Sequence, residues 1–404
     1  MRQGRTATGV AALAVVAVAG CSSADADPDI TVASEPPPEP EREVVLDQDD
    51  SSFTETPTTT MVAPRVDGPL AEVCPSTIVV QTTDRLSVQI GSLVALLGDQ
   101  PAIGDGTISG PVTRADGTVE EVTLELRIGG PSSGFRDALT VAASDETITL
   151  MHTSTAEMVR RHAEFPTVAV AALTESSRQS VLVDPATYPS AESIADVEEL
   201  GIEVRHFTAS PVYEFLGATG ALSPDQLVGG FDGEPAGFVA AQGAIAQQGD
   251  ILLDPAIFEA LPQWGRPIEA LPVSEAGWAD HDDVIAVRAD ELDELAPCMN
   301  RLIPVIQRAI ISYAEAPGDA NVALAAARAA FDPLSRVTVE VLDDAEVRAG
   351  ELGVVGNGDD STIGDLDLDR LDPFLDELAG ALGVDAVAVD VLATNEFVDP
   401  TIGR

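Results

Sequence analysis

The sequence of 404 residues has 68 acidic and 21 basic side chains, which gives a formal net charge of −47 at pH 7. A surface this acidic is repelled by nucleic-acid phosphates and by anionic lipid, and it argues against both as partners. The chain contains arginine but no lysine, so it cannot hold pyridoxal phosphate as a Schiff base.

The first residues have the features of an export signal, predicted over 1–20. Arg2 and Arg5 precede the apolar run 10–19, which is too short to span a bilayer but is typical of a secretory signal. The run leads into Val-Ala-Gly-Cys, which ends at Cys21 and resembles the lipobox of bacterial lipoproteins. The resemblance implies cleavage before Cys21 and lipid attachment to its sulfur. An ordinary signal peptide with a chance cysteine is the alternative.

Residues 21–73, which begin with this cysteine, have the composition of an acidic tether. They are rich in Pro, Thr and Ser, and they contain many acidic residues but only two basic ones, Arg42 and Arg65. Such a segment cannot bury enough apolar surface to offset its ordering entropy, so we expect it to be disordered.

Two further cysteines follow the tether. If Cys21 is lipidated, Cys74 and Cys298 remain as a pair, and an exported chain permits a disulfide between them. Two separate buried thiols are the alternative.

From Cys74 onward, strand patterns alternate with helical ones. In 122–143, Val122, Leu124 and Leu126 alternate with polar residues, a glycine-rich corner follows, and a helix is expected from Phe135. Further strands are expected at 77–81, 147–151, 167–173, 180–183, 202–207, 249–253 and 285–288, and helices at 194–200, 213–216, 238–247, 297–314, 322–331 and 371–382. The alternation predicts mostly parallel α/β sheets.

Small polar corners follow several of these strands. Ligands of open α/β sheets bind beyond the carboxyl ends of the strands, so we expect the corners to face one another across a cleft. The alternative for each corner is a capped turn with a purely local role. The corners are Thr82–Asp84, Gly129–Ser133, Thr153–Thr155, Thr208–Pro211 and Asp254.

Several segments resemble one family. The chain from Cys74 onward resembles the type II periplasmic substrate-binding proteins of ABC importers, in the branch with nitrate-, sulfonate- and thiamine-pyrimidine-binding members (the NMT1/THI5-like, SsuA-like group). The segments that carry the resemblance are Phe231–Gly249, Leu352–Asp365, Thr394–Phe397, Cys74–Ser76 with 79–82, and Gly129–Pro131.

The resemblance implies a two-lobe α/β fold with a cleft between the lobes. Lobe I is expected to be discontinuous, with residues 74–173 and 270–404, and lobe II to cover 174–269. The implied function is extracytoplasmic capture of a small polar solute, of the nitrate, sulfonate or pyrimidine class, for an ABC permease. The protein would be a monomeric lipoprotein anchored to the cell membrane, with no catalysis, cofactor or metal. The alternative is a ligand-sensing or envelope-interaction lipoprotein that kept the fold without transport.

The corners supply the candidate ligand-binding residues. Helix N-termini expected at Ser132 and Ser210 would favour an anion, whereas the acids Asp232, Glu234 and Asp254 would favour a cation or an amine. We expect a polar or anionic group on the Ser132 side. The candidates are Thr82, Thr83, Asp84, Gly130, Ser132, Ser133, Thr153, Ser154, Ser210, Asp232 and Asp254.

Overall fold

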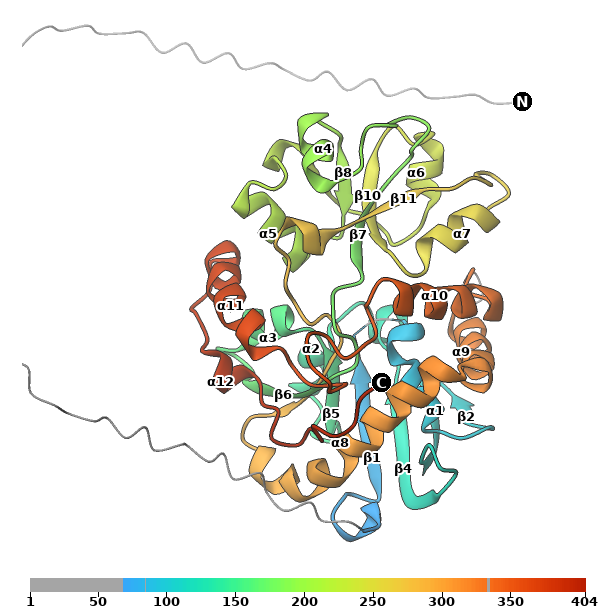
Figure 1. Ribbon diagram of the computed structural model, residues 1–404, viewed down its shortest axis with the longest axis vertical. Helices are drawn as coiled ribbons and strands as arrows, with labels where there is room; N and C mark the ends of the chain where they lie inside the picture. Colours follow the sequence, from blue (N-terminus) through green and yellow to red (C-terminus); the bar gives the residue numbers. More distant parts are fainter. Residues whose placement is uncertain (1–67, 84, 333–334) are drawn as a thin grey trace, which may run out of the picture. The chain divides into compact units, whose positions relative to one another are not determined.

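The computed structural model describes residues 68–83, 85–332 and 335–404, which form two β-sheets flanked by helices (Figure 1). The predicted signal peptide, Cys21, the tether up to residue 67, and Asp84 lie outside the described residues. The chain leaves the first sheet after Ala172, builds the second sheet, and returns to the first at Val284.

The first sheet has seven strands in the spatial order β2-β3-β4-β1-β5-β12-β6. Its strands are β1 (Thr77–Thr82), β2 (Ala102–Gly104), β3 (Thr107–Thr113), β4 (Val119–Arg127), β5 (Leu150–Thr153), β6 (Thr167–Ala172) and β12 (Val284–Arg288). The second sheet has five strands in the order β11-β7-β10-β8-β9. They are β7 (Gln179–Val183), β8 (Val204–His206), β9 (Leu227–Gly229), β10 (Ala246–Asp250) and β11 (Glu269–Pro272).

Hydrophobic patterning explains the strands of the first sheet. In β4, Val122, Leu124 and Leu126 are buried while their neighbours are more exposed, which confirms the predicted alternation. All six residues of β6 are buried, as expected for a strand covered on both faces. β6 therefore reads as a continuous apolar run although it is the last strand of the sheet, whereas β4, which lies further in, alternates.

The two sheets are mixed rather than mostly parallel. β1 pairs in parallel with β4 and β5, and β8 pairs in parallel with β9 and β10, but the other ladders are antiparallel. The chain leaves β6 at one end of the first sheet and comes back to β12 at that same end. β12 must therefore run against β5 and β6, a consequence of the excursion that local patterns do not reveal.

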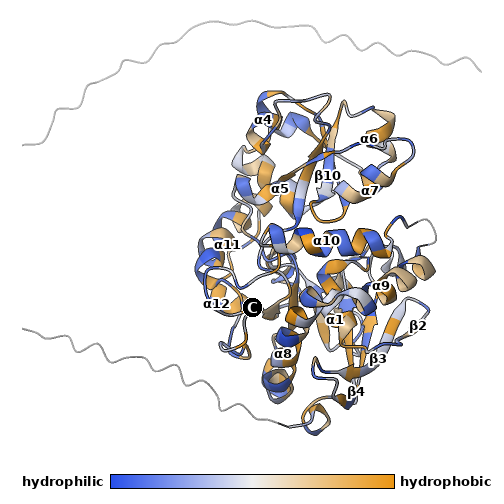
Figure 2. Cartoon of the chain, turned by 45° about the vertical axis from the view of Figure 1, so that its right-hand side comes forward, coloured by the Kyte–Doolittle hydropathy of each residue, from blue (hydrophilic) through white to orange (hydrophobic). Residues whose placement is uncertain are grey.

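Helices cover the faces of both sheets. In Figure 2, α8 and α10 carry both hydrophobic and hydrophilic colours along their length, as helices packed on one face do. No helix in the described part of the chain is long and apolar enough to cross a membrane. The α-helices are α1 (Gly91–Ala95), α2 (Ala138–Ala142), α3 (Thr155–Arg161), α4 (Ile194–Glu199), α5 (Pro211–Thr219), α6 (Ala236–Ala240), α7 (Asp254–Ala260), α8 (Leu292–Glu315), α9 (Gly318–Phe331), α10 (Val339–Glu351), α11 (Leu368–Leu382) and α12 (Val389–Leu392).

The corner after β4 differs from the prediction. Gly130–Ser133 form a short 3₁₀ helix, and both Gly134 and Phe135 have positive φ, at 67° and 59°. This left-handed pair ends the turn, so α2 begins only at Ala138, where the Asp137 side chain accepts a hydrogen bond from the Thr140 amide. The expected helix start at Phe135, with its N-terminus at Ser132, is wrong.

A second correction concerns the segment around Asp254. The predicted helix over 238–247 is the shorter α6, and the strand expected at 249–253 is β10, which ends at Asp250. Asp254 is the first residue of α7, and its carboxylate accepts a hydrogen bond from the Asp250 amide at 2.7 Å. It therefore closes the turn after β10 instead of standing at a strand end.

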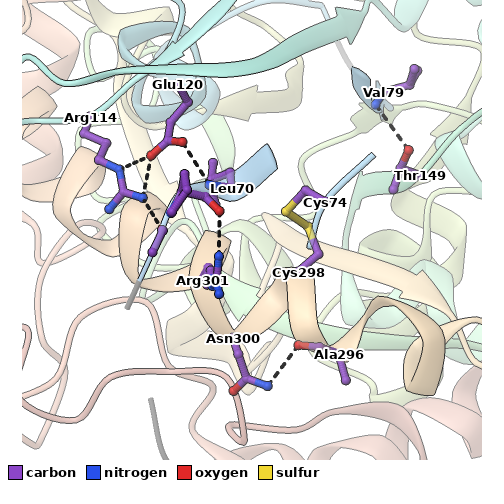
Figure 3. The surroundings of a disulfide bond; sticks show 12 residues. Leu70, Cys74, Val79, Arg114, Glu120, Thr149, Ala296, Cys298, Asn300 and Arg301 are labelled. Atoms are coloured by element: carbon purple, nitrogen blue, oxygen red, sulfur yellow. Dashed lines mark hydrogen bonds and ion pairs between the residues drawn. A yellow bond between two sulfur atoms is a disulfide. The ribbon is translucent and has the colours of Figure 1, made fainter. Parts of the chain in front are cut away.

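The described chain begins with a segment packed against β4 and α8, whereas disorder was expected for all residues up to 73. Residues 68–73, the end of the predicted tether, are packed there, with Leu70 fully buried and its amide donating to Glu120 at 2.9 Å. Arg301 of α8 donates to the Pro69 carbonyl at 2.6 Å. The predicted disulfide between Cys74 and Cys298 is present beside these contacts (Figure 3).

Replacing Cys74 and Cys298 together by serine is expected to lower the free energy of unfolding by about 2–5 kcal/mol. The bond joins residues 224 positions apart, so its loss increases the conformational freedom of the unfolded chain. Urea denaturation followed by tryptophan fluorescence checks this. A reductant should destabilise the wild type and leave the double variant unchanged; equal midpoints for the two proteins would contradict the prediction.

Candidate functional site: a polar cavity between the two sheets

A cavity of about 710 Å³ is lined by residues from both sheets and from the two segments that cross between them. Gly130 follows β4 and Thr153 ends β5 in the first sheet, whereas Ser210 follows β8 in the second. The polar corners after these three strands therefore line the same cavity, although they come from two different sheets. The predicted site residues that line the cavity are Thr83, Gly130, Thr153, Ser154, Ser210 and Asp232.

A second hollow of about 270 Å³ adjoins this cavity and shares part of its wall, including Gly130 and Arg178. Asp254 lines this second hollow. Three phenylalanines belong to both walls: Phe207 after β8, Phe231 after β9, and Phe135 before α2. The rings of Phe207 and Phe231 are 5.0 Å apart, and Phe135 is 67% exposed. The boundary between the 710 Å³ cavity and the 270 Å³ hollow is therefore lined by apolar side chains.

Three of the predicted site residues line neither hollow. Thr82 is fully buried and its hydroxyl accepts a hydrogen bond from the Gly129 amide at 2.9 Å, which fixes the turn after β4. Ser133 donates to the carbonyls of Gly130 and Arg136, and Ser132 is exposed outside both hollows. These three residues shape the corner without reaching the cavity.

The end of β5 supplies the inner wall. Ser154 is the N-cap of α3 and accepts a hydrogen bond from the Glu157 amide at 3.1 Å. Thr153 is 2% exposed, and its hydroxyl has no hydrogen-bond partner among the described residues. His152 places its Nε2 atom 3.0 Å from Asp283 Oδ1.

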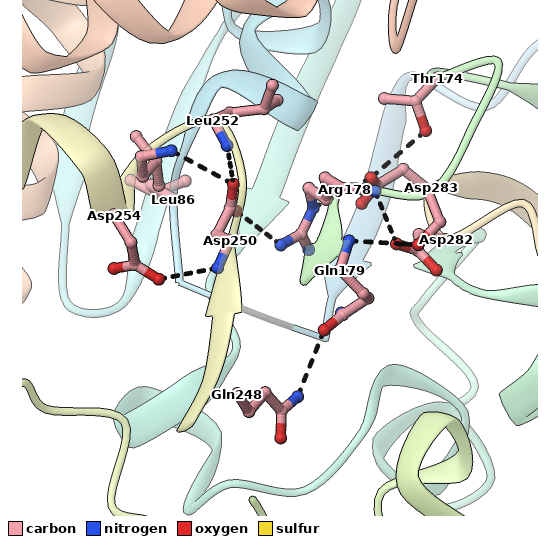
Figure 4. A network of polar contacts seen from close by, with 12 residues as sticks. Leu86, Thr174, Arg178, Gln179, Gln248, Asp250, Leu252, Asp254, Asp282 and Asp283 are labelled. Atoms are coloured by element: carbon pink, nitrogen blue, oxygen red, sulfur yellow. Dashed lines mark hydrogen bonds and ion pairs between the residues drawn. The ribbon is translucent and has the colours of Figure 1, made fainter. Parts of the chain in front are cut away.

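The two crossing segments, 173–178 and 273–283, are joined by a buried ionic network (Figure 4). Arg178 Nε lies 3.2 Å from Asp283 Oδ2, and Arg178 Nη1 lies 2.8 Å from Asp250 Oδ2 in lobe II. The Arg178 amide donates to Asp282 at 3.1 Å. Burial alone would raise the pKa of Asp283, but Arg178 and His152 hold it at about 2, so this carboxylate stays ionised.

Other acids on the cavity wall are harder to ionise. Burial, reinforced by the neighbouring Asp283, raises the pKa of Asp282 to about 6. Burial and Asp282 raise the pKa of Asp280 well above its ordinary value. Burial also raises the pKa of Glu157 to about 7, although Arg160 and Arg161 oppose the shift. A cationic group in the cavity would favour the ionised form of these carboxylates.

Sequence reasoning missed much of this wall. Arg178 and Gln179 were assigned to no site because they fall at the start of a strand, and Glu157 lies inside a helix. The run Asp280-His281-Asp282-Asp283 was the available signal, since several consecutive charged or ionisable residues before an apolar strand are unusual. Phe135 and Phe231 had no local signal. Within residues 68–404, apart from the gaps stated above, no group of three or more His, Cys, Asp or Glu side chains is arranged to hold a metal ion.

Replacing Glu157 by glutamine is expected to raise the free energy of unfolding by roughly 1–2 kcal/mol near pH 8, after allowance for solvent screening. The native state binds the Glu157 proton more tightly than the unfolded chain does, because burial raises the pKa from 4.5 to about 7. Ionisation of Glu157 therefore does not lower the free energy of unfolding below about pH 4.5, and it lowers that free energy by its full amount above about pH 7.

Urea denaturation of both proteins at about pH 8 and about pH 5 measures this difference. The gain of the glutamine variant should shrink as the pH falls. A gain that does not change between the two pH values would contradict the prediction.

The fold can be compared with those of known proteins. No protein-family model and no curated protein sequence matches the chain. The periplasmic nitrate-binding protein NrtA from Synechocystis aligns with 80% of this chain and 87% of its own, at 14% identity and a TM-score of 0.51. The alkanesulfonate-binding protein SsuA from Xanthomonas axonopodis, bound to MOPS, aligns with 79% of this chain and 99% of its own, at 11% identity and a TM-score of 0.48. The described part of the chain therefore has the fold of the periplasmic binding protein NrtA.

Proposed function

We propose that this protein binds a small polar solute in the cavity between its two lobes and delivers it to an ABC importer. The observation that carries the proposal is that Gly130, Thr153 and Ser210, which follow or end strands of different sheets, line one cavity of about 710 Å³. A volume of several hundred cubic ångströms is typical of small-molecule sites. The fold shared with NrtA supports the same reading.

The lobes in this proposal follow the two sheets. Lobe I comprises residues 74–173 and 270–404, and lobe II comprises 174–269. The first sheet takes strands from 77–172 and 284–288, and the second takes strands from 179–272. The sheets support this division except at one boundary: β11 belongs to the second sheet, so lobe II extends to Pro272 and lobe I resumes after it. Lipid attachment at Cys21 and an extracytoplasmic location belong to the proposal and rest on the sequence of the first 21 residues.

Binding requires no bond to be made or broken. The solute touches both lobes at once, so it stabilises the arrangement in which they are close and shifts the population towards it. The crossing segments 173–178 and 273–283 are the only connections in the described chain between the sheets, and they would carry the hinge motion. Thr83, Thr153 and Ser154 offer hydrogen bonds from lobe I, and Ser210 and Asp232 offer them from lobe II.

Native mass spectrometry of the freshly purified protein tests the proposal directly. We expect a noncovalent adduct with the mass of a small metabolite, lost on denaturation. Isothermal titration of that metabolite should then show one site per chain. Small-angle scattering should show a smaller radius of gyration with the solute than without it.

Replacing Thr153 by valine is expected to weaken solute binding by about tenfold, since it removes a buried hydroxyl that lines the cavity and has no partner among the described residues. The matched control is Thr167→Val. Thr167 is also buried with an unpaired hydroxyl among the described residues, but it begins β6 and does not line the cavity.

Titration calorimetry compares the two variants with the wild type. Equal weakening by both variants would point to a general effect on folding and would contradict the assignment of Thr153. A protein that yields no adduct and binds no small solute would contradict the proposed function itself.

A further inference from the structure

The cavity wall contains buried polar atoms that no described residue satisfies. His152 Nδ1, Thr153 Oγ1 and Asp280 Oδ2 have no hydrogen-bond partner among the described residues. Each of the three side chains is 2% exposed, and each lines the cavity. Buried polar atoms are almost always paired, so three unpaired atoms on one wall mark the place where a bound molecule would supply the partners.

The contacts of these residues show what kind of partner is missing. Asp283 is ionised and can only accept hydrogen bonds, so His152 Nε2 carries a proton towards it. In the neutral ring, His152 Nδ1 is then an acceptor. Asp280 Oδ1 accepts hydrogen bonds from the Thr155 hydroxyl and, at 3.1 Å, from the Ala156 amide, so in the ionised form of Asp280 the Oδ2 atom is a further acceptor. With Asp280 ionised, the Thr153 hydroxyl is the only donor among the three unpaired groups, and the other two accept.

The charged residues of the cavity wall also indicate that the missing partner is a hydrogen-bond donor. The carboxylate of Glu157 makes no hydrogen bond or ion pair with any described residue, and it lines the cavity. Glu157 follows Ala156, whose amide donates to Asp280, so it adds another acceptor at the start of α3. The arginines of the inner wall are already engaged: Arg160 pairs with Glu214, Arg161 with Asp137, and Arg178 with Asp250 and Asp283.

One arginine is left to attract an anion. Arg136 forms no ion pair within the described chain, but it is exposed, and its Nε donates to the Ser133 carbonyl at 3.0 Å. An anion has no N–H group to donate, so it would leave the acceptors Asp280 Oδ2 and His152 Nδ1 without partners. A buried carboxylate without a partner is costly, whereas a positive group with N–H donors would satisfy it.

We propose that the solute carries a cationic N–H group, a primary ammonium or an amidinium, which donates to Asp280 and is flanked by Thr153 and His152. This inference rests on the proposed function and names the class of its solute. It replaces the expectation of an anionic group on the Ser132 side, since Ser132 does not line the cavity.

Three ligands of one shape test the proposal: benzamidinium, benzamide and benzoate. Putrescine, agmatine, nitrate and ethanesulfonate extend the set to aliphatic cations and small anions. Thermal shift followed by titration calorimetry on the purified full chain should show binding by members of the cationic class, with benzamide and the anions at least tenfold weaker. Asp280→Asn should weaken the best cation at least tenfold.

Asp365→Asn is the matched control. Asp365 also has a buried carboxylate oxygen without a partner in the described chain, but it lines a separate hollow near α11 and should leave cation affinity within twofold of the wild type. If Asp280→Asn does not fold, Glu157→Gln provides the second variant and should weaken the cation about threefold.

The inference is overturned if no cation binds, or if Asp280→Asn and Glu157→Gln both keep wild-type affinity for the best cation. Its failure is distinct from that of the proposed function. Binding of benzoate, nitrate or ethanesulfonate that Thr153→Val weakens would overturn the cationic solute and leave solute capture intact. Absence of any adduct and of any bound probe would overturn both.

Discussion

The contact between Arg178 and Asp283 is the constraint on which the rest of the structure depends. It joins the two segments that cross between the sheets, and Arg178 also reaches Asp250 at the end of β10 in lobe II. Burying ions is costly unless each is paired and hydrogen-bonded, and here the carboxylates also accept from His152, Ser177 and the Arg178 amide. The network thus fixes the start of the second sheet relative to the end of β5. The position of the cavity follows from it.

Local patterns predicted several strands of the first sheet but missed its β2 and β3. β1, β4 and β6 lie where apolar runs and alternation placed them, because burial on one or both faces leaves a direct record in the sequence. The direction of β12 could not be predicted in the same way. Its direction depends on which end of the first sheet the chain re-enters after building the second sheet, a segment of more than a hundred residues. Local sequence patterns contain no information about that point of re-entry.

The candidate site was predicted in outline and missed in detail. Polar residues after strands were expected to meet, and Gly130, Thr153 and Ser210 do line one cavity. The corner after β4 was misread because Phe135 adopts a positive φ, which few residues other than glycine do, so the helix start moved to Ala138. Glu157 and Asp280 belong to a helix and a crossing segment, and only tertiary packing brings them to the same wall. The spacing of residues in the sequence therefore could not predict that Glu157 and Asp280 line the same cavity.

The attachment of residues 68–74 has a mechanical consequence. Cys74 lies three residues before β1, while Thr83, just beyond the other end of that strand, lines the cavity. Tension applied to the chain ahead of residue 68 meets the hydrogen bonds of Arg301 and Glu120 first and then the covalent bond from Cys74 to α8. The load passes into a 24-residue helix and bypasses the central strand. Such tension would thus be borne by α8 and would not reach the opposite end of β1, where Thr83 lines the cavity.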